Sequence, residues 1–173
     1  MALLLALLFP FIPNVVRQVR AASFVETAVT MHRSYLNGNR PLGLRSSSPE
    51  LVTAWFTGKV AFHFQLPNAQ PALNETPSYQ LTGASVVNYR GSPVALVTYE
   101  KRSEKLSLLV ASSDSAPVAG GDEAHFVDLI FHSRTDDGFK VITLEQSWPL
   151  VWVSFKRIRL STRILPGLSS KHV

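Results

Sequence analysis

The sequence predicts an α+β domain: two amino-terminal amphipathic helices packed on a six- to seven-stranded antiparallel meander sheet, preceded by a hydrophobic segment. Three observations carry this prediction. Uncharged, mostly apolar residues fill positions 1–16, helical periodicity follows in residues 23–58, and residues 79–155 read as alternating strands separated by short polar turns. Because such short turns leave no room for crossover helices, neighbouring strands are expected to be antiparallel.

Length and charge set the domain organisation. The 173 residues are enough for one domain with a core and too few for two comfortable ones. The formal charge of +5 comes wholly from the basic residues after position 155, since basic and acidic residues balance before it. We therefore predict a hydrophobic segment 1–20, a folded domain 21–155 and a basic, disordered tail 156–173. Charge confined to a tail does not indicate a nucleic-acid partner.

The amino-terminal run "MALLLALLFPFIPNVV" has three interpretations. The first is a truncated membrane span, because the run is apolar but shorter than the roughly 20 residues that cross a bilayer as a helix. A signal peptide with cleavage after Ala21 is the second interpretation, since Val19 and Ala21 are small. A buried core helix is disfavoured because the run has no polar face. Residues 1–16 are thus expected to contact a membrane.

Two helices are expected next. Ser23 and Glu26 have the spacing of a capping box, which predicts that a helix begins anew near residue 24 and ends at Asn37-Gly38. His32 lies on the apolar stripe of this helix and is interpreted as a packing histidine. Ser48-Pro49 predicts the start of a second, shorter helix, which Gly58 ends.

The second helix carries the only predicted recognition patch, Trp55, Phe56 and Lys59, because an aromatic pair beside a charge suits an interface. Core burial of the aromatic rings is the competing interpretation, with Leu51, Val52, Trp55 and Phe56 forming one buried stripe. Residues 60–65 alternate between apolar and polar and predict a strand directly after the helix.

The remaining strands are predicted in chain order at residues 79–89, 94–100, 106–113, 125–133, 139–146 and 150–155. In the third of these, Leu106, Leu108 and Val110 alternate with Ser107. Such alternation is typical of a sheet that is covered on one face only. The two helices would be that cover.

The sequence predicts no catalytic residues, no metal site and no cofactor. There is no cysteine, which excludes thiolate metal sites and a cysteine nucleophile. His125 and His132 are near neighbours, but a separation of seven along one strand places them on opposite faces. Asp136 and Asp137 precede Gly138 and are interpreted as solvated turn residues, not as an acid-base pair. The chain is therefore not expected to be an enzyme.

The stretches "HRSYLNGNRPLGLRSSSPELVTAWFTGKVAFHFQLP", "YQLTGASVVNYRGSPVALVTYEKRSEKLSLLV" and "FHSRTDDGFKVITLEQSWPLVWVSF" occur in this order. Together they resemble the extracytoplasmic, carboxyl-terminal domain of bacterial transmembrane anti-sigma factors, over residues 21–155. The resemblance implies a single-pass protein of the bacterial inner membrane whose outer domain faces the periplasm. It also implies a sigma factor held by a cytoplasmic zinc module with His and paired Cys, which this chain lacks.

Two functions of different classes follow. The first is a non-enzymatic sensory domain of a membrane-tethered anti-sigma factor, which acts in transcription regulation across the membrane with an unknown periplasmic protein or ligand as partner. The second is a secreted or periplasmic module that binds a ligand or peptide at its sheet face or free strand edge. Retention or cleavage of the amino terminus separates them.

Overall fold

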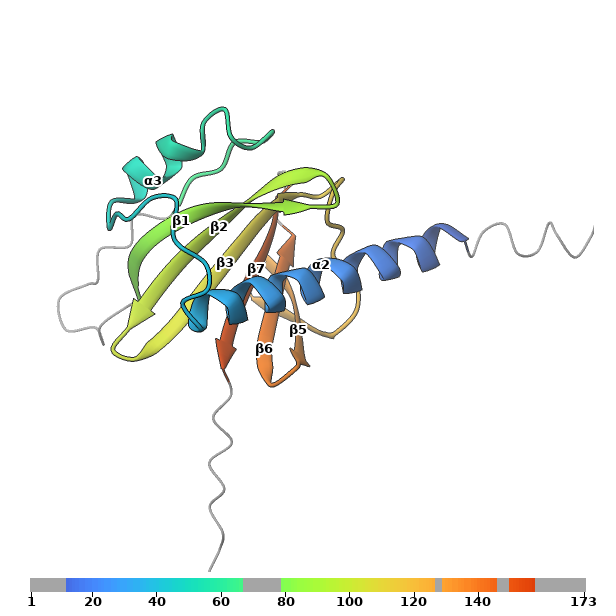
Figure 1. Cartoon of the computed structure of the whole chain (residues 1–173). Coiled ribbons are helices and arrows are strands. Elements are labelled where there is room, and N and C mark those ends of the chain that lie inside the picture. Colours follow the sequence, from blue (N-terminus) through green and yellow to red (C-terminus); the bar gives the residue numbers. More distant parts are fainter. Residues whose placement is uncertain (1–11, 67–78, 127–128, 146–149, 158–173) are drawn as a thin grey trace, which may run out of the picture.

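A computed structural model describes residues 12–66, 79–126, 129–145 and 150–157 of the chain. Figure 1 shows one antiparallel sheet with a long helix across one face and a short helix on the other. The helices are α2 (Ile12–Leu36) and α3 (Pro49–Phe56). The strands are β1 (Gln80–Tyr89), β2 (Ser92–Lys101), β3 (Glu104–Ser112), β4 (Asp122–Phe126), β5 (Leu129–Asp136), β6 (Phe139–Glu145) and β7 (Leu150–Arg157).

The strand order differs from a meander. Among the described residues the order is β1-β2-β3-β7-β6-β5-β4, so the last strand lies between two antiparallel halves of three strands each. β7 pairs with β3 from Ser107↔Phe155 to Ser112↔Leu150, and with β6 on its other side. The predicted meander is therefore wrong. A meander needs β3 beside β4, whereas the chain leaves β3, builds the second half from its outer edge inward, and closes on β3 with β7.

The second half also divides differently from the prediction. The stretch 125–133, predicted as one strand, contains the end of β4 and most of β5, which form a hairpin with His125 opposite Ile130. The hairpin of β5 and β6 turns at Asp137 and Gly138, both with positive φ, as the predicted turn at these residues requires.

α2 is one helix over residues 12–36, with Pro13 in its first turn, where proline is tolerated. The predicted new start at Ser23 is wrong, because Ser23 lies in the helix interior and its carbonyl accepts a hydrogen bond from the Thr27 hydroxyl at 2.9 Å. The predicted end at Asn37-Gly38 is confirmed. Gly38 has φ 70°, and the amides of Gly38 and Asn39 bond back to the carbonyls of Tyr35 and Ser34 at 3.1 and 3.0 Å, a Schellman motif.

The sheet half made of β1, β2 and β3 is covered on both faces, so the prediction of one covered face is wrong. α2 packs on one face with Phe24, Val25, Ala28 and Val29. Its partners on the sheet include Val87, Leu96 and Leu109. Ser107, predicted to face solvent, is fully buried on this same face. α3 packs on the opposite face with Val52 and Phe56, against sheet residues that include Ala84, Val97, Leu108 and Val110.

α3 begins as predicted. The Ser48 side chain accepts a hydrogen bond from the Leu51 amide at 3.2 Å, and Pro49 occupies the first turn. The predicted strand 60–65 is wrong, since residues 57–66 form turns and irregular chain. Phe64 and Leu66 are nevertheless buried and pack beneath α3. The edge of β1 that such a strand would need is used in part by Leu44, which exchanges two backbone hydrogen bonds with Ala84.

The predicted terminal segments are only partly described. Residues 12–20 of the predicted hydrophobic segment 1–20 belong to α2, not to a separate element, and residues 1–11 lie outside the described residues. Lys156 and Arg157 of the predicted tail 156–173 end β7, and the rest of the tail lies outside the described residues. Among the described helices, none combines the length and apolarity needed to span a membrane.

Candidate functional site

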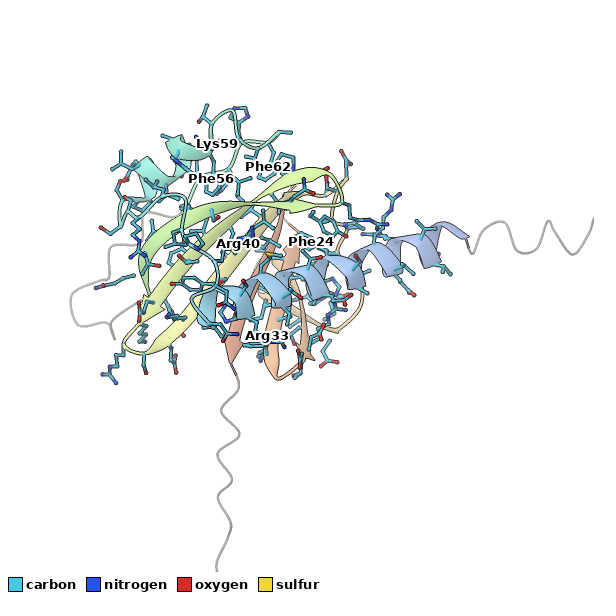
Figure 2. All side chains as sticks on the ribbon, viewed as in Figure 1. Phe24, Arg33, Arg40, Phe56, Lys59 and Phe62 are labelled. Atoms are coloured by element: carbon cyan, nitrogen blue, oxygen red, sulfur yellow. The ribbon has the colours of Figure 1, made fainter. Side chains whose placement is uncertain are left out.

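The predicted recognition patch lies on and just after α3. Phe56 is 1% exposed and belongs to the core between α3 and the sheet, so its ring is not available to a partner. Figure 2 places Phe56 and Lys59 on the opposite side of the sheet from Phe24 of α2. Of the three predicted residues, Phe56 is therefore part of the core, whereas Trp55 and Lys59 are at least partly accessible.

Trp55, which is half-buried, forms a pair with Lys59, which is exposed. The Lys59 ammonium lies 4.7 Å from the centroid of the Trp55 ring and donates a hydrogen bond to the Trp55 carbonyl at 2.8 Å. The indole packs edge-to-face on Phe56, with ring centroids 5.0 Å apart, and closely against Gly43. Leu51, predicted to be buried, is 63% exposed. α3 and the turn that follows it thus offer one exposed leucine and a lysine whose charge already interacts with an aromatic ring.

A second site lies between α2 and the end of β5, and we call it the α2–β5 cleft. Its volume is about 440 Å³. Arg134 and Asp136 point toward α2, because their pairing partners Val141 and Phe139 belong to the core beneath that helix. Polar groups on the cleft wall are Glu26, Thr30 and Arg33 from α2 and Arg134, Asp136 and Asp137 from the hairpin. Val29 supplies apolar surface.

The charges in the cleft are arranged unequally. Arg33 forms an ion pair with Asp137, and its guanidinium lies 5.7 Å from the centroid of the Phe139 ring. The side chains of Arg33 and Asp137 are 43% and 59% exposed, so this pair lies at the rim. The Arg134 Nε, in contrast, is buried and has no hydrogen-bond partner among the described residues. The cleft therefore holds one neutralised guanidinium and one buried guanidinium donor that is still unsatisfied.

A serine and a histidine meet beneath α2. The His32 Nδ1 lies 2.7 Å from the Ser107 Oγ, and both residues are 0% exposed. The His32 ring also packs edge-to-face on Phe139, with ring centroids 5.2 Å apart. Burial, together with the smaller effect of the positive charge of Lys105, lowers the pKa of His32 to about 4. A neutral imidazole hydrogen-bonded to a serine hydroxyl is the base and nucleophile pair of many hydrolases. Here both side chains are fully buried, so a substrate cannot reach them.

The histidines at the outer edge of the sheet do not lie as predicted. Glu123 is directly opposite His132, and His125 is directly opposite Ile130, so both histidines point to the same face of the sheet. The prediction of opposite faces is wrong because the chain turns between them. The His125 Nε2 lies 2.7 Å from the Glu123 carboxylate. Among the described residues, no three histidines or carboxylates are placed to hold a metal ion.

The α2–β5 cleft was not predicted from the sequence. Asp136 and Asp137 were recognised as turn residues, which they are, but Glu26 was assigned to a helix cap and Arg134 carried no signal of its own. The one available signal was the alternation of Arg134 and Asp136 toward the face that bears Phe139 and Val141. Comparison with known protein families, with curated proteins and with solved structures finds no match for this chain, so the geometry alone bears on function.

Proposed function

We propose that this chain is the non-enzymatic outer domain of a membrane-tethered regulator of the anti-sigma factor type. Residues 1–16 would hold it at the bacterial inner membrane, with the domain on the periplasmic side. The observation that carries the proposal is the continuity of α2. The helix begins at Ile12, inside the apolar run 1–16, and continues without a break to Phe24, Val25 and Ala28 in the core.

Continuity matters because a sensory domain must pass its state to the segment that precedes it. Residues 14–20 are all exposed, and the amino-terminal part of α2 extends away from the sheet in Figure 1. A helix that leaves the core without a flexible linker keeps its direction fixed relative to the sheet. A change in how α2 packs on the sheet would then change the position of the helix end nearest the membrane. The regulator's sigma factor would be held by a zinc module that this cysteine-free chain does not contain.

A second function, a secreted or periplasmic binding module, is favoured by one observation. Burial of α2 begins at Ala21, which is 3% exposed, whereas the side chains of residues 14–20 are exposed. A chain cleaved after Ala21 would therefore keep most of the packed part of the helix. Its partner would be a ligand or peptide in place of a membrane-transmitted signal.

The two functions separate in one experiment. The full chain is expressed in a bacterium, the cells are fractionated, and the mass of the mature protein is measured. A tethered regulator is expected in the inner-membrane fraction with Met1 or Ala2 at its terminus, and protease added to spheroplasts should degrade its domain. Recovery in the soluble exported fraction with Ala22 at the terminus would contradict the tether and support the secreted module.

A matched variant excludes incomplete cleavage as the cause of retention. Val19 is 60% exposed, so Val19→Lys leaves the packing of α2 intact, yet a lysine at this position blocks signal cleavage after Ala21. For a tethered protein, wild type and variant should fractionate alike. For a secreted protein, only the variant should remain with the membrane.

A further inference from the structure

The α2–β5 cleft contains one cation that is prepared for a ligand. Arg134 lines the cleft from β5. Its Nε is covered by the protein itself and has no hydrogen-bond partner among the described residues, so a ligand in the cleft would meet the terminal amino groups of the guanidinium. The guanidinium is planar and presents parallel N–H groups that match the two oxygens of a carboxylate. The group that Arg134 fits best is therefore a carboxylate.

The other guanidinium in the cleft has a different task. Arg33 is paired with Asp137 and lies over the Phe139 ring. The carboxylate balances its charge, and the ring contact holds its position. This contact joins α2 to the turn between β5 and β6. Arg33 and Asp137 thus form a wall of the cleft, which leaves Arg134 as the cation for a ligand.

The remaining charges exclude a simple anion or a simple cation as the preferred ligand. Glu26 and Asp136 line the same cleft as Arg134. A simple anion on Arg134 would lie near these two carboxylates, and a simple cation would lie near the guanidinium, so each would meet repulsion. A small molecule with one carboxylate and one ammonium group matches both signs.

Size and surface agree with such a ligand. A volume of about 440 Å³ is in the range of small-molecule sites. Val29 offers apolar contact for a short aliphatic part, and the Thr30 hydroxyl offers one further hydrogen bond. We infer that the α2–β5 cleft binds a free amino acid, with its carboxylate on Arg134 and its ammonium group on Glu26 and Asp136. This inference holds for a tethered or a secreted chain.

The test is calorimetric titration of the full chain, purified in a mild non-ionic detergent, with each of the common amino acids. At least one should bind saturably. For the tightest binder, the matched amine without the carboxylate and the matched acid without the amine should each bind about tenfold more weakly or worse, because each loses one charge-assisted interaction. Failure of every amino acid to bind, or equal binding of the amine or the acid, would overturn the inference.

Variants locate the site. Arg134→Gln should weaken binding of the amino acid about tenfold or more, and Asp136→Asn should do the same from the ammonium side. Arg134→Lys keeps the charge but not the planar donor pair, so it should give an intermediate affinity. Arg102→Gln removes an exposed arginine from the turn between β2 and β3 and should bind like wild type. Unchanged affinity in both Arg134 variants, with melting temperatures equal to wild type, would place the ligand elsewhere and overturn the inference.

Discussion

At the scale of single residues, His32 is held neutral inside the folded domain. It is 0% exposed, its Nδ1 lies 2.7 Å from the Ser107 hydroxyl, and burial together with the charge of Lys105 lowers its pKa to about 4. In the unfolded chain the same imidazole titrates near its ordinary value of 6.5. Between these two values only the unfolded state binds a proton at His32, so acid favours unfolding in this window.

The first prediction follows from this difference. The free energy of unfolding should be highest above pH 6.5 and should fall by roughly 2 to 3 kcal/mol between pH 6.5 and 4, with no further loss from His32 below that. Urea titrations at a series of pH values measure this slope. His32→Gln should flatten it, whereas His63→Gln, at an exposed position, should leave it as in wild type. A slope that persists unchanged in His32→Gln would contradict the assignment.

Two apolar residues of α3 differ strongly in burial. Phe56 is 1% exposed in the core, and Leu51 is 63% exposed on the outer face of the helix. The second prediction is that Phe56→Ala lowers the free energy of unfolding by about 3 to 5 kcal/mol, whereas Leu51→Ala changes it by no more than about 0.5 kcal/mol. Chemical denaturation of both variants measures the contrast. Equal losses would mean that Leu51 is also covered.

At the scale of elements, the start of α3 depends on one hydroxyl. The third prediction is that Ser48→Ala lowers the free energy of unfolding by about 1 kcal/mol, because the Leu51 amide loses its acceptor. Ser47→Ala is the matched control, one residue earlier and exposed, and should be close to neutral in the same denaturation experiment. A neutral Ser48→Ala would show that solvent caps the helix as well as the serine does.

Local signals predicted those features that local chemistry decides. The cap at Ser48, the helix end at Gly38 and the turn at Asp137 and Gly138 were all predicted correctly, since each depends on the conformation of one to four residues. The capping box at Ser23 and Glu26 failed for a related reason. A capping pattern permits a helix to begin, but nothing in it prevents a preceding helix from continuing through.

Features that depend on distant pairing could not be predicted. Residues 60–65 have strand alternation, yet Leu44 already uses part of the β1 edge, so the chain there packs its apolar side chains without joining the sheet. The placement of β7 between β3 and β6 likewise depends on which edges are free, not on the sequence of β7. The α2–β5 cleft unites Glu26 with Arg134, and no spacing rule relates residues so far apart.

At the scale of the whole molecule, α2 divides into an exposed part, residues 14–20, and a part that packs on the sheet from Ala21 onward. Side-chain burial begins at Ala21, and the residue before it accepts a hydrogen bond of 3.0 Å from the Tyr89 hydroxyl at its carbonyl, that of Arg20. The fourth prediction is that a chain beginning at Val19, which keeps this carbonyl, unfolds within about 1 kcal/mol of the full chain. Thermal and urea unfolding of the two chains test it. A much larger loss would show that the exposed turns of α2 take part in folding.

The unbroken α2 has a geometric consequence. An α-helix turns by about 100° and advances about 1.5 Å with each residue. The number of residues between Ile12 and Ala21 therefore sets the angle about the helix axis at which the sheet lies relative to Ile12. Adding one residue there would swing the α2–β5 cleft about a quarter of the way round, while adding seven would bring it almost back to its starting azimuth. The direction in which the cleft faces therefore depends on the number of residues in this part of α2.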